Sequence, residues 1–133
     1  MDFRSRSVTY DYLTNDQTGM TNYYDPNGQI FAMSDARGNT TFYGYDELGR
    51  RTSVKNALGQ VSRSRFDPVG NLTETIDALG RTNRFDYDPL NRRAAVIFPD
   101  LSTQTTTYDA SSRRIAETDQ SGNTTWFGYD LSL

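Results

Sequence analysis

An aromatic residue followed by an aspartate recurs along this chain at a constant interval of 21 residues (45 − 24, and likewise at each later step). No insertion or deletion interrupts the interval, so the chain is predicted to be an array of like structural units. The six motif pairs are Tyr24-Asp25, Tyr45-Asp46, Phe66-Asp67, Tyr87-Asp88, Tyr108-Asp109 and Tyr129-Asp130.

The period divides the chain into two parts. Residues 24–133 are predicted to hold five full repeats and the start of a sixth. Residues 1–23 are predicted to be an irregular N-terminal segment or a degenerate repeat, because Tyr10-Asp11 lies 14 residues before Tyr24 and is out of register. The terminal units of repeat arrays are usually atypical.

Each repeat carries a first turn signal directly after the motif aromatic. Its aspartate can accept backbone hydrogen bonds, its second position is often proline, and its fourth position is glycine, which favours a left-handed conformation. This pattern is typical of a type I turn followed by a G1 bulge in a β-hairpin. The glycines are Gly28, Gly49 and Gly70; Asn91 replaces glycine in the fourth repeat, and Ser112 is a weaker substitute in the fifth.

A second turn signal with the same pattern follows about ten residues later in each repeat, as in Asp77-Ala78-Leu79-Gly80. The fourth repeat departs from it with Phe98-Pro99-Asp100-Leu101. Leucine is strained in the left-handed conformation, so we expect this turn to be built differently from the others.

The segments between the turns are short and rich in Thr, Val, Ile and aromatic residues, a composition typical of β-strands. No segment has the length and periodicity of an ordinary helix. The predicted fold class is therefore all-β: an antiparallel meander of 21-residue β-hairpin repeats in a twisted, curved open sheet. Alternation places Tyr45 with Tyr43 and Tyr87 with Phe85 on one face, and Phe42, Trp126, Arg63, Arg84 and Thr105 on the other.

Composition argues against several function classes. The net charge of −3 disfavours nucleic acid as a partner, and no apolar run approaches the roughly 18 residues of a membrane-spanning helix. The N-terminus lacks the apolar region of a secretory signal peptide. There is neither cysteine nor histidine, so no disulfide, histidine-based triad or imidazole metal site is expected.

The aspartates could in principle perform acid–base chemistry. However, they follow the repeat, whereas an active site would interrupt it, so we interpret them as turn residues. We therefore expect no enzymatic activity, no catalytic residue and no cofactor. Calcium is also disfavoured, because one acid per turn falls short of the 6–8 oxygen ligands that the ion takes.

Pairs of arginines occupy one repeat position just after the first turn. They form a candidate stripe for an anion or a glycan. The alternative is that their guanidinium groups pair with nearby acids while their stems cover aromatic surface, and the acidic net charge favours that alternative. The pairs are Arg50-Arg51, Arg92-Arg93 and Arg113-Arg114.

The run Phe42-Tyr43-Gly44-Tyr45-Asp46-Glu47-Leu48-Gly49-Arg50 resembles the YD repeat of the Rhs family, as does Asp77-Ala78-Leu79-Gly80-Arg81-Thr82. The resemblance covers about residues 20–133. The family includes bacterial Rhs polymorphic toxins, the C subunits of insecticidal toxin complexes and the teneurins. It implies a sheet strip that spirals into a shell around an effector. The chain carries no counterpart of the segment with which the toxins cleave themselves.

The resemblance leads to these expectations. The chain is a structural wall segment of a larger bacterial protein that is secreted or displayed at the cell surface, and its partners are the rest of the shell and the enclosed effector. Edge-to-edge self-association, or an irregular N-terminal segment folded over one end of the sheet, is expected, because end strands leave backbone groups unpaired. A module that binds carbohydrate or a cell surface, with exposed Tyr, Trp and Arg on sugar rings, is the alternative.

Overall fold

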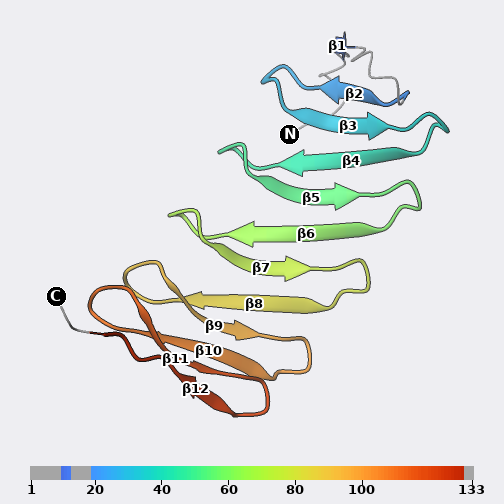
Figure 1. Cartoon of the computed structure of the whole chain (residues 1–133). Coiled ribbons are helices and arrows are strands. Elements are labelled where there is room, and N and C mark those ends of the chain that lie inside the picture. Colours follow the sequence, from blue (N-terminus) through green and yellow to red (C-terminus); the bar gives the residue numbers. More distant parts are fainter. Residues whose placement is uncertain (1–9, 13–18, 131–133) are drawn as a thin grey trace. The chain divides into compact units, whose positions relative to one another are not determined.

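The computed structural model describes residues 10–12 and 19–130 (Figure 1). These residues form β-strands and no helix, and the strands follow one another in sequence order within the sheet. The strands are β1 (Tyr10–Tyr12), β2 (Thr21–Tyr24), β3 (Ile30–Ser34), β4 (Thr40–Tyr45), β5 (Arg51–Lys55), β6 (Val61–Phe66), β7 (Leu72–Ile76), β8 (Thr82–Tyr87), β9 (Arg93–Ile97), β10 (Thr103–Tyr108), β11 (Arg114–Thr118) and β12 (Thr124–Trp126).

The fold is an antiparallel meander of hairpins, which confirms the predicted all-β class. The chain divides into two compact units, residues 1–63 and 64–133, and the division falls inside β6. In the first unit each strand pairs with the next from β1 to β6. In the second unit the same pattern runs from β7 to β12.

The first and second turns differ in whether the strand register shifts beside the turn. At the first turn the register shifts beside the motif aromatic, for instance between Gly44 and Tyr45 and between Asp86 and Tyr87. At the second turn the register is continuous, as in the pairing of β7 with β8. The predicted hairpins with a bulge are therefore present in the first, second, fourth and fifth repeats, and there the bulge lies at the first turn.

The expectation of a differently built turn in the fourth repeat was wrong. Phe98 N–H donates to the Ser102 carbonyl and Leu101 N–H donates to the Phe98 carbonyl, each at 2.9 Å, as in the other second turns. Leu101 takes the left-handed conformation with φ 68°. Asp100 accepts the Ser102 N–H at 2.9 Å, which supplies a cap where Phe98 replaces the usual first-position acid. Pro99 favours the required φ at the second position.

The sheet has almost no core of its own. Within the described residues the only buried hydrophobic side chains are Ala32 (3% exposed) and Ala116 (5% exposed). Each lies opposite a large aromatic of the neighbouring strand, Phe42 and Trp126 respectively. Because a single sheet layer has no second layer to pack against, its larger side chains stay partly exposed.

The two faces of the sheet differ in exposure along the same strand. In β8, Phe85 and Tyr87 are half-buried, whereas Arg84 and Asp86 are exposed. In β10 the pattern repeats, with Thr105 exposed. This alternation agrees with the predicted assignment of Phe85 and Tyr87 to one face and Arg84 to the other. Within the described part of the chain there is no helix that could cross a membrane.

Candidate functional site

The aspartate of each first turn holds the turn closed. Asp46 N–H donates to the Arg50 carbonyl, and the Asp46 side chain accepts the backbone N–H groups of Leu48 and Arg50, all at 3.0 Å. The same pattern of bonds recurs at Asp25, Asp67, Asp88 and Asp109. The fourth position takes φ between 61° and 99° in all five turns: Gly28, Gly49, Gly70, Asn91 and Ser112.

The first arginine of each pair binds back to that aspartate. Arg50 Nε lies 2.6 Å from Asp46 Oδ2, Arg92 Nε lies 2.7 Å from Asp88 Oδ2, and Arg113 Nε lies 2.8 Å from Asp109 Oδ2. In the third repeat Asn71 stands at the same position, and its amide donates to Asp67 Oδ2 at 2.9 Å. These side chains therefore extend the turn rather than project into solvent.

The same position also connects one repeat to the next. Arg92 Nη1 donates to the Asp109 carbonyl and contacts Ser112 Oγ, both at 3.1 Å. Gln29 Nε2 donates to the Gly49 carbonyl at 3.1 Å, and Asn71 Nδ2 donates to Asn91 Oδ1 at 3.0 Å. We call the edge formed by the first turns the first-turn rim. Within each of the two units, its neighbouring turns are bonded through these side chains.

Four of the motif tyrosines bond their hairpin to the preceding one. The hydroxyl of Tyr87 donates to the Leu72 carbonyl at 2.8 Å, 15 residues earlier in the chain. Tyr45, Tyr108 and Tyr129 make the same bond to the carbonyls of Ile30, Arg93 and Arg114. The Arg92 guanidinium lies 4.6 Å from the centroid of the Tyr108 ring, and that of Arg113 lies 4.6 Å from the Tyr129 ring.

The second arginines have different partners. Arg51 lies 4.3 Å from the ring centroid of Tyr43, Arg93 lies 5.5 Å from that of Phe85, and Arg114 lies 5.3 Å from that of Phe127. Arg114 also pairs with Glu117 at 2.7 Å. The first arginine of each pair thus binds its own turn, and Arg92 and Arg113 also lie over the next motif tyrosine. The second arginine lies over a different aromatic ring.

Several turn aspartates have a lowered pKa. Hydrogen bonds from the Arg81 guanidinium and backbone lower the pKa of Asp77, and those from the Asn123 backbone and amide lower the pKa of Asp119. Partial desolvation raises the pKa of Asp46, but the hydrogen bonds from Arg50 outweigh it and the net shift is downward. These carboxylates are therefore held ionised, as suits turn caps.

One charged cluster is made of residues that the sequence analysis did not predict as a site. Glu74, whose side chain is 13% exposed, pairs with Arg65 Nη1 at 2.9 Å and with Arg84 Nε at 3.3 Å. The pairing of Glu74 with Arg84 across β7 and β8 follows from period-2 alternation once the hairpin register is known. Among the described residues, no group of three or more His, Cys, Asp or Glu side chains is placed to hold a metal ion.

The repeat seen in the turns, strands and tyrosines has a counterpart among known families. The model of the family described as RHS Repeat matches the chain twice, at residues 24–61 and 66–103. This chain belongs to the RHS repeat family. Both matched stretches begin at a motif aromatic, Tyr24 and Phe66, which lie two 21-residue periods apart, so the matches are in phase with the period found in the sequence.

Solved structures also resemble this RHS repeat segment. It is similar to a chain in the crystal structure of TcdB2-TccC3-Cdc42 (TM-score 0.41), to one in TcdB2-TccC3 (0.40) and to one in a Photorhabdus luminescens Tc holotoxin pore (0.39), each at 17% identity over 74% of this chain. The segment spans 7% of the length of those chains. No curated protein matches it in sequence.

Proposed function

We propose that this RHS repeat segment forms part of the wall of a β-sheet shell that encloses a toxin or effector. The observation that carries the proposal is the bonding between successive repeats within each of the two units. Main-chain pairing, the tyrosine hydroxyl bonds and the bridges of the first-turn rim all recur with the repeat. A sheet bonded in this way can lengthen repeat by repeat without a new core.

The same architecture suits containment rather than chemistry. Strands joined by short turns leave little backbone for a protease to bind, because a protease needs an extended segment that can detach from its neighbours. The near absence of a core among the described residues is expected of a sheet whose faces are completed by other parts of a larger assembly. We further propose that this larger protein is bacterial and is secreted or displayed at the cell surface.

Protease protection in the full product of the gene tests the proposal. We expect the segment outside the repeat array to be cleaved only after the shell is opened by denaturant, and electron microscopy of the same protein to show a hollow particle. A variant lacking residues 66–86, one whole repeat, is the matched control, because it keeps strand direction and turn phase. Cleavage of all regions at similar rates, with no hollow particle, would contradict the proposal.

Carbohydrate binding is the alternative function, and the exposed aromatics favour it. Trp126 is 75% exposed and Phe42 is 48% exposed, and both belong to the face opposite the motif tyrosines. Flat aromatic side chains of this kind can stack on sugar rings. A glycan array followed by calorimetry with the whole chain would support this function if binding were lost in Trp126→Ala, and an array without signal would remove it.

A further inference from the structure

The large hydrophobic side chains that remain exposed are concentrated at the tips of the turns. Residues at turn tips are usually polar or glycine, whereas exposed apolar groups that recur in one place mark contact surfaces. Six of the nine such side chains in the described residues lie in turns: Leu48, Leu58, Val69, Leu79, Leu90 and Leu101.

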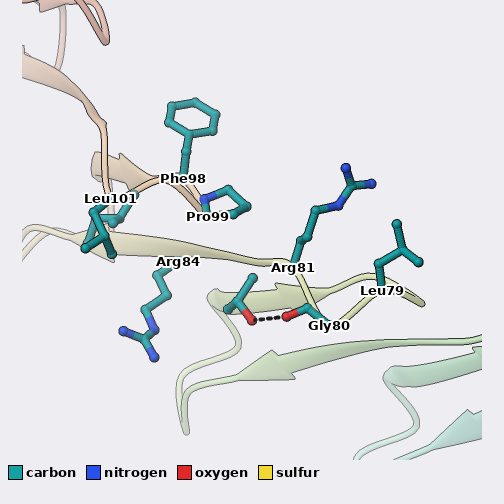
Figure 2. A pocket seen from close by; sticks show the side chains of 9 residues that line it. Leu79, Gly80, Arg81, Arg84, Phe98, Pro99 and Leu101 are labelled. Carbon is teal, nitrogen blue, oxygen red and sulfur yellow. Dashed lines mark hydrogen bonds between the residues drawn. The ribbon is translucent and has the colours of Figure 1, made fainter.

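A groove separates two neighbouring second turns in the unit formed by residues 64–133. Figure 2 shows Leu79 on one side and Phe98, Pro99 and Leu101 on the other. Two turns on the same edge of a meander lie two strand spacings apart, roughly 9.6 Å. That separation leaves room for about one inserted aliphatic side chain between the two turns.

The groove also carries two arginines with hydrogen-bonding capacity to spare. Arg81 and Arg84 both line it, and the side chain of each is 64% exposed. Each makes its intramolecular ion pair through Nε, to Asp77 at 2.6 Å and to Glu74 at 3.3 Å. These bonds leave the terminal guanidinium nitrogens to donate to a carboxylate from outside the chain.

The chemistry that fits this groove is an exposed aliphatic side chain beside an exposed carboxylate. The first turn formed by residues 46–49 presents both, because Leu48 is 72% exposed and the adjacent Glu47 is exposed. Its backbone is held by the Asp46 hydrogen bonds, so little ordering is required on binding. The corresponding tips with Val69 and Leu90 carry proline where this tip carries Glu47.

We infer that the groove between the second turns binds the Glu47-Leu48 tip of a second copy of this chain. Leu48 enters between Leu79 and Leu101, and the Glu47 carboxylate accepts hydrogen bonds from Arg81 or Arg84. The two surfaces are different patches of one molecule, so the contact is head-to-tail and repeats from copy to copy into open-ended oligomers. The inference does not depend on the proposed shell.

Sedimentation velocity of the whole chain tests the contact. We expect wild-type protein to form larger species as its concentration rises, and Glu47→Arg to weaken this association roughly tenfold or more, because it places a cation against the groove arginines. Ala110→Arg is the matched control: it adds the same side chain at the same turn position of another first turn, and it should associate like wild type.

Two groove variants complete the test. Arg81→Glu and Leu101→Glu should each prevent the groove from binding the Glu47-Leu48 tip. Leu101→Glu leaves the Arg81–Asp77 pair intact. Circular dichroism checks that all variants fold. A mixture of Glu47→Arg with Leu101→Glu should form a one-to-one dimer, because one variant keeps the groove and the other keeps the tip.

Three results would overturn the inference. The first is a wild-type chain that stays monomeric at all concentrations. The second is association that survives both the Glu47 and the groove substitutions, which would point to pairing between strand edges instead. The third is a mixture of the two variants that fails to form the dimer although each of them is folded.

Discussion

Among the residues that the structure describes, three other than glycine hold the left-handed position of a turn: Asn91, Leu101 and Ser112. Asparagine tolerates this conformation because its side chain can bond locally, whereas leucine has no such compensation. The strand register of the hairpin, the Pro99 φ and the Asp100 cap together impose the conformation on Leu101. At this residue, the structure of the whole hairpin prevails over local preference.

Leu101→Gly is therefore predicted to stabilise the chain. Relief of the left-handed strain should contribute about 1–2 kcal/mol, and the greater freedom of glycine in the unfolded chain should offset about 0.5–1 kcal/mol of that. Leu101 is 79% exposed, so little burial is lost. Urea denaturation at low protein concentration measures the change. Leu79→Gly, at an exposed turn position with ordinary φ, is the control and should lower stability.

The lowered pKa values of the turn aspartates predict a loss of stability in acid. A carboxyl whose pKa is lower in the folded than in the unfolded chain stabilises the fold above its unfolded pKa, about 3.9 for aspartate. This stabilisation is lost as the pH falls through the lower folded value. Asp119 and Asp77 belong to this group, so the free energy of unfolding should fall as the pH drops from about 4 toward 2.

Asp119→Asn isolates one carboxyl of this group. Asn56 occupies the same turn position in another repeat and accepts the backbone N–H groups of Leu58 and Gln60, so the amide keeps the cap. The variant should be nearly as stable as wild type at neutral pH and should lose less stability in acid. Asp119→Ala, which removes the cap as well, should be less stable at every pH. An unchanged acid dependence in Asp119→Asn would count against the role of this carboxylate.

At the scale of the hairpin, the two rims of the sheet are built differently. Arg92 joins its own turn to the next first turn and stacks on Tyr108. Arg81 pairs with Asp77 in a second turn at a similar distance, but its side chain is 64% exposed and this ion pair stays within its own turn. Tyr87 and Tyr108 each add a bond between hairpins close to the first-turn rim.

Arg92→Ala should accordingly cost more stability than Arg81→Ala. The Arg92 side chain is 21% exposed and its loss removes a charged hydrogen bond network and a ring contact, about 1–2 kcal/mol together. An exposed ion pair such as that of Arg81 contributes about 0.2–1 kcal/mol. Chemical denaturation of both variants measures the difference. Equal losses would show that the bridge between turns adds nothing to the pairing within a turn.

Tyr87→Phe tests the other connection between hairpins. It removes the hydroxyl that donates to the Leu72 carbonyl at 2.8 Å, and it should lower the free energy of unfolding by about 0.5–1.5 kcal/mol. Tyr43→Phe is the control, because its contact with the Arg51 guanidinium involves the ring and does not need the hydroxyl. The prediction is contradicted if the two variants unfold at the same denaturant concentration.

At the scale of the whole molecule, we expect stability to depend more on the phase of the turns along the chain than on the number of repeats. Stability in an array is approximately a sum over repeats and their interfaces. Deletion of residues 66–86 removes one repeat and keeps every turn on its own rim. Deletion of residues 77–87 removes a second turn and β8, so all later strands reverse direction and later first turns fall on the opposite rim.

The first deletion should therefore lower stability modestly and leave a single cooperative transition, whereas the second should split or broaden the unfolding transition of residues 64–133 at the site of the deletion. In the second, the bonds across the deletion are lost, because Tyr87 is removed and Asn71 and Asn91 fall on opposite rims, whereas the bonds among later repeats are kept. Circular dichroism during thermal unfolding distinguishes the two outcomes. A half-repeat deletion that unfolds as sharply as the whole-repeat deletion would show that turn phase is unimportant.

The sequence by itself determined the period, the turn positions and the strands between them, because Asp at the first position and Gly at the fourth act within a few residues of chain. It also indicated that arginine stems and aromatics would meet. The tertiary structure alone decided the particular partners: Arg92 on the next turn, Tyr87 on the Leu72 carbonyl, Glu74 between two arginines and Leu101 in a left-handed turn. These contacts join residues from different strands and turns, so they depend on the register and bulge of each hairpin, which local propensity does not specify.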